Sequence, residues 1–184
     1  MAKSSTSVKG FDYRKSLRAG ENYVKLQFLL DDSAEFTLGD MVRIDTDGLL
    51  VVNGAGNTIF GKLDGIVDLN GINIFSPRAQ GTAGSTLTPD DTITTSSTNS
   101  TDATRKIKGE VIIDPAGLNL YYNDSNGTLA QTNVGQCFDL TSTGDQVDQA
   151  TATDGTAQMQ LLQIDPDGDG DASKGLFRIV ENQY

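Results

Sequence analysis

The segment from Gln158 to Tyr184, QMQLLQIDPDGDGDASKGLFRIVENQY, constrains the fold of this 184-residue chain most strongly. Apolar and polar side chains alternate in its first part, MQLLQI, and again in its second part, LFRIVE. Aspartates, glycines and a proline separate the two parts. A period of two indicates β-strands, because successive side chains point to opposite faces, and an Asp/Gly/Pro cluster is typical of a turn. The segment is therefore predicted to be a β-hairpin.

Further strand signals recur at short intervals. The stretch GDMVRIDTDGLLVVN (39–53) places Asp-Gly between two apolar runs, which favours a tight hairpin turn. Short apolar runs punctuated by turn residues follow at 59–75, 107–124 and 134–140. Roughly nine to eleven short strands and no sustained helical period predict an all-β fold, a sandwich or barrel of short antiparallel strands.

The first predicted strand lies in NYVKLQFLL (22–30). Its alternate residues are apolar throughout and are predicted to face the core. These residues are Val24, Leu26, Phe28 and Leu30.

Two polar stretches set the predicted domain organisation. Residues 1–21 show no periodicity and are predicted to form an extended N-terminal arm on a β-domain that spans 22–184. Residues 78–106 are nearly all Thr, Ser, Gly, Ala and Asp, which predicts a long exposed loop or a Thr-rich two-stranded excursion. This insert could also divide the β-domain into two lobes, 22–77 and 107–184.

The absence of histidine bears most directly on catalysis. It removes the commonest general base, the commonest metal ligand and every nucleophile activated by histidine. Because no other acid–base constellation is visible, the chain is predicted not to be an enzyme and to need no cofactor. The single cysteine, Cys137, alternates within a strand signal and is predicted to be a small buried side chain rather than a reactive thiol.

Charge is distributed unevenly. The net charge of −11 argues against nucleic-acid binding, which needs a basic surface. Residues 1–25 nevertheless carry a balance of +4, which favours an arm that docks on an acidic partner surface. The candidate partner-binding residues are Lys3, Lys9, Arg14, Lys15 and Arg18. No apolar stretch is long enough for a signal peptide or a bilayer span, so synthesis in a cytoplasm and no membrane contact are expected.

The Asp-rich turn of the last hairpin matches the start of a calcium loop. Its carboxylates belong to Asp165, Asp167, Asp169 and Asp171. The twelfth position of such a loop is a bidentate glutamate, but here it is Leu176, and no flanking helices are predicted. A calcium site and a solvated anionic hairpin tip both remain open, and the missing glutamate favours the tip.

Three elements together resemble the head decoration, or cement, proteins of tailed bacteriophages. They are the GDMVRIDTDGLLVVN hairpin followed by IFGKLDGIVD, the VGQCFDL strand with its polar loop, and the terminal MQLLQIDPDGDGDASKGLFRIVENQ segment. The resemblance covers about 110 residues and rests on patterns rather than strict identities. It implies a compact β-protein without catalytic residues that binds the outer capsid surface of a virion. The implied partners are the major capsid protein and further copies of the chain, with a trimer favoured.

Two other classes of function stay open at this point. One is another phage structural protein, such as a tail-tube or capsid subunit, although these usually contain a substantial helix. The other is a surface carbohydrate-binding or adhesin β-domain, which would be expected to display aromatic platforms. The chain has no tryptophan, and Tyr121-Tyr122 is its clearest aromatic pair.

Overall fold

The computed structural model describes residues 10–17, 23–75, 92–101, 106–153 and 157–181. Its regular structure is almost entirely antiparallel β, which confirms the predicted all-β fold. Within these residues the helical structure is confined to two short 3-10 turns, η1 (Gln131–Asn133) and η2 (Gln149–Thr151).

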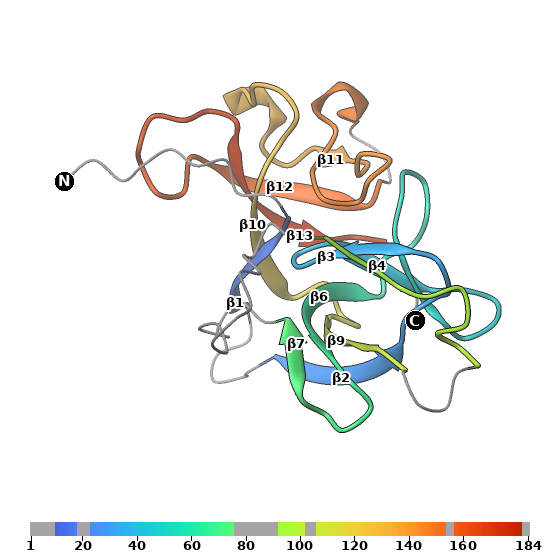
Figure 1. The fold of residues 1–184 in the computed structure, drawn as a ribbon. Helices are drawn as coiled ribbons and strands as arrows, with labels where there is room; N and C mark the ends of the chain where they lie inside the picture. The colour runs from blue at the N-terminus through green and yellow to red at the C-terminus, as the bar shows by residue number, and fades with distance from the viewer. Residues whose placement is uncertain (1–9, 18–22, 76–91, 102–105, 154–156, 182–184) are drawn as a thin grey trace.

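The strands form three sheets (Figure 1). The five-stranded sheet has the order β1 (Asp12–Ser16), β10 (Asn119–Asp124), β13 (Lys174–Ile179), β12 (Met159–Ile164) and β11 (Cys137–Phe138). The six-stranded sheet has the order β2 (Val24–Leu29), β9 (Lys108–Ile113), β6 (Gly61–Val67), β4 (Met41–Ile44) and β5 (Leu50–Val52), with β7 (Asn73–Phe75) beside β6. The two-stranded ribbon pairs β3 (Glu35–Thr37) with β8 (Thr92–Thr94).

Two hydrophobic cores lie on opposite faces of the six-stranded sheet. The first core joins this sheet to the five-stranded one, because Met41 packs there with Tyr121, Phe138 and Phe177. Val42, the next residue of β4, belongs instead to the second core. That core also contains Phe36 of the ribbon. The alternation along β4 therefore places the six-stranded sheet as the middle layer between the five-stranded sheet and the ribbon.

Both predicted hairpins are confirmed. In the last one, β12 pairs antiparallel with β13, and Met159, Leu161, Phe177 and Ile179 are buried as the alternation requires. In the earlier one, β4 pairs with β5, and Asp45 accepts the backbone N–H of Leu49 at 2.8 Å across the turn. Both hairpins rest on local signals, since each turn carries its own hydrogen-bonding aspartate.

Strands β9 and β10, by contrast, do not form a hairpin. β9 lies in the six-stranded sheet and β10 in the five-stranded sheet, so the turn that begins at Asp114 is a corner between layers. The Asp114 carboxylate is buried there and accepts the N–H groups of Leu118 and Asn119 at 2.9 and 3.0 Å. The predicted lobe 107–184 is therefore divided between the two large sheets, with β9 between β2 and β6 of the predicted lobe 22–77.

The N-terminal region differs from the predicted arm at residues 10–17. Strand β1 pairs with β10, and Phe11 is 2% exposed in the first core. β1 (DYRKS) is short and polar, so it carries no apolar alternation, and this is why it was missed. Lys3, Lys9 and Arg18 lie outside the described residues.

Strand β2 forms within the predicted range, but its predicted core face is wrong at one end. Leu30 is fully buried, and the ring centres of Phe28 and Phe60 lie 4.9 Å apart. By contrast, Val24 and Leu26 are 55% and 43% exposed. In the described part of the sheet β2 lies at the edge, and the second core does not extend to its first residues. Periodicity identifies the apolar face of a strand, but the neighbouring layer decides how much of that face is covered.

The Thr/Ser-rich insert 78–106 contributes one strand and a buried polar anchor. β8 pairs with β3, which lies outside the insert, so the described part of the insert supplies one strand of a ribbon rather than a two-stranded excursion of its own. Asn99 is 1% exposed, and its side-chain amide donates to the carbonyls of Leu30 and Ile107 at 2.7 and 3.1 Å. This anchor fixes the described part of the insert to the ends of β2 and β9.

Candidate functional site

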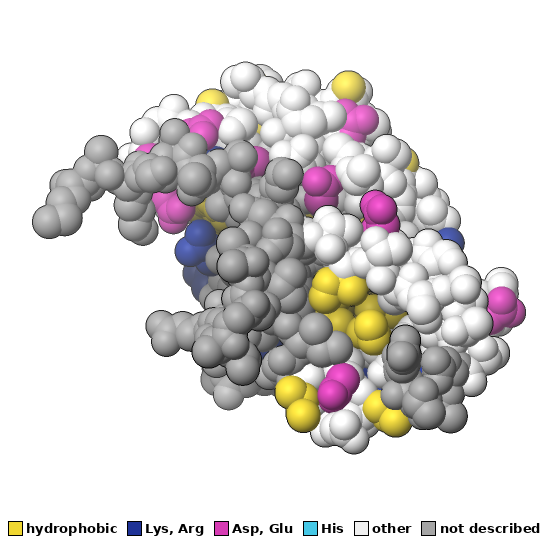
Figure 2. Space-filling view, in the orientation of Figure 1, with side chains coloured by type: hydrophobic (Ala, Val, Ile, Leu, Met, Phe, Trp, Pro, Cys, Tyr) yellow, Lys and Arg dark blue, Asp and Glu magenta, His cyan; other side chains and the backbone are white. Residues whose placement is uncertain are grey.

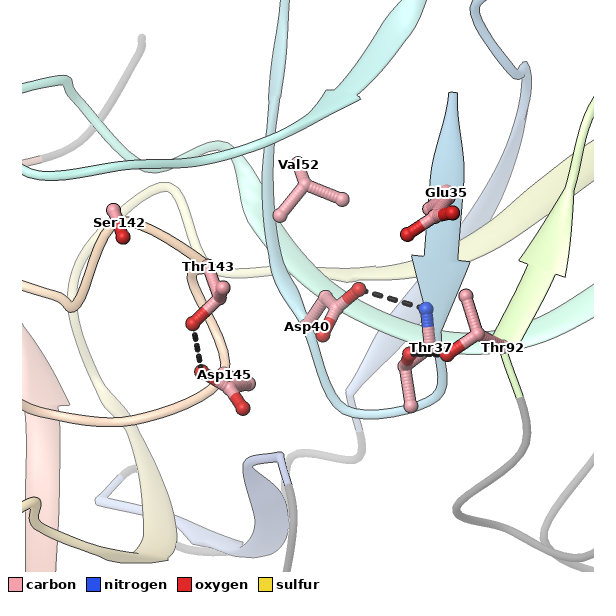
Figure 3. Close-up of a pocket in the computed structure, with 8 residues that line it drawn as sticks. All are labelled: Glu35, Thr37, Asp40, Val52, Thr92, Ser142, Thr143 and Asp145. Carbon is pink, nitrogen blue, oxygen red and sulfur yellow. Dashed lines mark hydrogen bonds between the residues drawn. The ribbon is translucent and has the colours of Figure 1, made fainter. Parts of the chain in front are cut away.

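A pocket of about 380 Å³ opens between the ribbon, the start of β4 and the loop 141–146 (Figure 3). Its lining consists of three carboxylates, four hydroxyls and one valine. These residues are Glu35, Thr37, Asp40, Val52, Thr92, Ser142, Thr143 and Asp145. They come from four separate stretches of the chain, so no short motif marks the pocket.

Asp40 enters the pocket from the tight turn between β3 and β4. Gly39, just before it, has a φ of 95°, a backbone conformation that favours glycine. The Thr37 N–H donates to Asp40 Oδ2 at 2.7 Å, and the Asp40 N–H donates back to the Thr37 carbonyl at 3.2 Å. These two bonds fix the carboxyl group against the turn, and Asp40 is only 4% exposed.

Asp145 approaches from the opposite side on the loop 141–146. Its Oδ1 accepts the hydroxyls of Thr143 at 2.5 Å and Thr141 at 3.1 Å. The Gly144 carbonyl of the same loop accepts the N–H of Met41 at 3.1 Å, which joins the loop to β4. A β-carbon on Gly144 would overlap the Asn53 carbonyl oxygen, so glycine permits this close approach.

The electrostatics of the pocket centre on Asp40. The pKa of Asp40 is raised to about 7, chiefly by burial; the hydrogen bond from Thr37 acts in the opposite direction, and the negative charge of Asp145 adds a smaller upward shift. An ordinary aspartate is fully ionised at neutral pH, but a carboxyl group with this pKa exchanges its proton there. A strongly shifted carboxyl group in a cleft identifies a candidate functional site. Asp40 can therefore take up a proton, and the carboxyl groups of the pocket could bind a cation or accept hydrogen bonds from hydroxyl groups of a ligand.

The Asp-rich turn is organised around a lysine. Lys174 Nζ lies 2.5 Å from Asp169 Oδ2 and 3.6 Å from Asp171 Oδ2, and its side chain is 8% exposed. Asp165 accepts the backbone N–H groups of Asp169 and Gly170 at 3.0 and 2.9 Å. An internal ammonium and backbone amides thus face these carboxylates. In the described part of the chain no three acidic, histidine or cysteine side chains are grouped to hold a metal ion.

Two of the predicted partner-binding residues lie on β1. Arg14 and Lys15 are both exposed. The Arg14 guanidinium lies 4.5 Å from the centre of the Tyr122 ring and 3.7 Å from Asp167 Oδ2. The structure therefore brings one predicted basic residue next to the Asp-rich turn of the same molecule.

Cys137 and the tyrosine pair are packed inside the molecule. Cys137 is 6% exposed, and burial raises the pKa of its thiol, in agreement with the prediction of a buried side chain. Tyr121 and Tyr122 are 0% and 2% exposed, so neither ring offers a platform to a ligand.

Sequence reasoning missed the pocket because Asp40 and Asp145 look like ordinary turn residues. The nearest signal is the Gly-Asp pair before β4, which marks a turn but not burial.

No helix in the described residues is long and apolar enough to cross a membrane. No family model, curated protein or solved structure matches the chain.

Proposed function

We propose that this chain is a structural protein of a tailed-phage virion that binds the outer capsid surface and stabilises the head against the pressure of packaged DNA. The observation that carries the proposal is the apolar start of the edge strand β2. Val24 and Leu26 are 55% and 43% exposed there. The resemblance of three sequence elements to head decoration proteins supports the same assignment, and two of those elements form hairpins.

The start of β2 is suited to contact another protein. Among the described strands β2 is the terminal one of its sheet, and an edge strand can extend its sheet with a strand from a partner. Two of its polar side chains already have partners within the molecule. Lys25 Nζ lies 2.5 Å from Asp64 Oδ2, and the Gln27 side-chain amide donates to Glu110 Oε1 at 3.1 Å. These contacts hold the strand in place and leave Val24 and Leu26 as the groups that gain most from being covered.

Capsid binding by such a protein depends on many copies. Burying an apolar side chain contributes about 1.5–3 kcal/mol, so each contact through β2 is modest. A capsid presents many equivalent sites, and a protein that bridges neighbouring capsid subunits opposes their separation at each of them. We propose the major capsid protein as the partner, and a trimer as the form that binds.

The alternatives are less well supported. A carbohydrate-binding or adhesin domain would need exposed aromatic rings, but the clearest candidates, Tyr121 and Tyr122, are buried and the pocket lining contains no aromatic residue. Another phage structural role, such as a tail-tube or capsid subunit, would use the same edge strand. Binding to finished heads separates that role from decoration.

The test uses heads purified from a deletion strain of the phage that carries the gene. Adding back the full-length protein is expected to raise the temperature at which these heads rupture. Leu26→Glu and Val24→Glu are each expected to weaken binding to heads by about tenfold or more, because a charge replaces an apolar contact. Ile72→Glu is the matched control, since Ile72 is 63% exposed in the turn between β6 and β7 and does not belong to β2.

Two results would overturn the proposal. One is that heads rupture at the same temperature with and without bound protein. The other is that all three variants bind like the original chain. Sedimentation of the free protein and of protein released from heads tests whether a trimer forms.

A further inference from the structure

We infer that Asp40 and Asp145 form a proton-sensitive junction between β4 and the loop 141–146: uptake of a proton by Asp40 tightens the junction, and loss of that proton loosens it. The inference concerns the pocket of Figure 3 and is independent of the proposed capsid function.

The junction joins two layers of the molecule. The loop 141–146 follows β11 of the five-stranded sheet, and it meets β4 of the six-stranded sheet through the bond from Met41 N–H to the Gly144 carbonyl. Asp40 and Asp145 each lie one residue from that bond. Any repulsion between their carboxylates therefore acts directly on the contact between the layers.

Among the residues that the structure describes, few charges are placed to offset this repulsion. The other described ionisable group that lines the pocket is Glu35 on β3, which adds a further negative charge. Lys62 on β6 directs its ammonium to Asp64 Oδ1 at 2.7 Å. Arg43 lies one residue beyond Val42, which pairs with the pocket residue Val52, so it belongs to the opposite face of the sheet. Thr92 on β8 is uncharged.

The direction of the pH effect follows from the buried state of Asp40. Its pKa in the folded protein is about 7, above the ordinary value of 3.8. A carboxyl group with a raised pKa holds its proton more tightly when folded than when exposed, so its ionisation opposes the closed state. The contribution of this group to the junction is therefore fully present below pH 3.8. It is lost as the pH rises from 3.8 to about 7, and the penalty is constant above that value.

The amide of Met41 reports the junction directly, because its hydrogen bond crosses it. We expect its protection factor against hydrogen exchange to fall by about tenfold or more between pH 5 and pH 7.5, since one pKa unit of differential proton binding is tenfold in an equilibrium. The Leu161 amide, bonded to the Gln136 carbonyl at 3.1 Å within the five-stranded region, serves as the reference and should change less. EDTA in every sample keeps divalent cations from neutralising the carboxylates.

Three variants separate the causes. Asp40→Asn keeps an acceptor for the Thr37 N–H and cannot ionise, so the pH dependence at Met41 should disappear. Asp145→Asn removes the facing charge and should reduce the fall. Asp47→Asn makes the same change of charge in the exposed β4–β5 turn and should leave the profile unchanged.

Three outcomes would overturn the inference. In the first, the protection of Met41 does not change with pH in the original chain. In the second, Asp40→Asn shows the same fall as the original chain. In the third, Met41 and Leu161 lose protection equally, which would make the effect global. If Asp40→Asn does not fold, the original chain and Asp145→Asn still decide between these outcomes.

Discussion

At the scale of single residues, buried charges account for what the sequence pattern leaves open. Lys62 and Lys174 are 5% and 6% exposed, and each is held by an aspartate. A buried ammonium needs such a partner, because removing it from water is costly. Sequence reasoning identified the aspartates around Lys174 but did not predict that a lysine of the next strand would fold back among them. Neither the predicted calcium site nor the predicted solvated hairpin tip included the ammonium group of Lys174.

Asp169 is therefore expected to matter more than Asp167, although both belong to the same acidic turn. Bonds from Lys174 lower the pKa of Asp169, so its ionised form stabilises the folded state above pH 3.8 and this contribution is lost as the pH falls through the lowered value. Asp169→Asn should lower the melting temperature at pH 7. Asp167→Asn, which affects an exposed contact with Arg14, should change it little. Thermal unfolding at pH 7 and pH 3 checks both, and equal effects at pH 7 would contradict the role of Lys174.

At the scale of elements, local signals were sufficient for hairpins but not for strands whose partners are distant. The β4–β5 and β12–β13 hairpins carry both their strands and their turn within one short stretch. Strand β1 has its partner in β10, and β9 and β10 separate into different sheets although they are joined by a turn. How far the apolar face of β2 is buried depends on the layer that packs against the six-stranded sheet. None of these relations can be read from the period of a single segment.

Strand β1 is expected to stabilise the fold through Phe11. Because Phe11 is 2% exposed in the first core, Phe11→Ala should lower the free energy of unfolding by about 3–5 kcal/mol. Leu17→Ala is the control from the other end of the same segment, since Leu17 is 50% exposed and its loss should cost about 0.5 kcal/mol or less. Urea unfolding measures both values. Similar small losses would restore the view of residues 10–17 as part of an arm.

At the scale of the whole molecule, the middle sheet links the layers. Met41 places the six-stranded sheet in the first core, while Val42 and Leu63 place it in the second. Figure 2 shows, on one face, apolar side chains gathered in a patch among polar ones, with acidic side chains scattered around it. The candidate pocket is also a property of the packed molecule rather than of any one element. Its residues lie in four separate stretches that meet only after the layers have packed, so no single segment indicates it.

We expect a single cooperative unfolding transition rather than two. Near-UV circular dichroism of tyrosine reports mainly the five-stranded sheet, through Tyr13, Tyr121 and Tyr122, whereas far-UV circular dichroism reports every strand. Because the two large sheets share the first core, the urea transitions from both probes should coincide. Two separate midpoints would support independent lobes at 22–77 and 107–184.

The pairing of β1 with β10 also sets an order in time. Asp12 lies opposite Tyr122, so the earliest described strand has no partner until well over half of the chain has been synthesised. β13, which lies on the other side of β10, follows much later still. A nascent chain therefore holds Phe11 uncovered through most of translation. Distant pairings of this kind slow folding, because long loops must close before the contacts form. Such a protein would depend on chaperones that shield an emerging chain more than its final stability suggests.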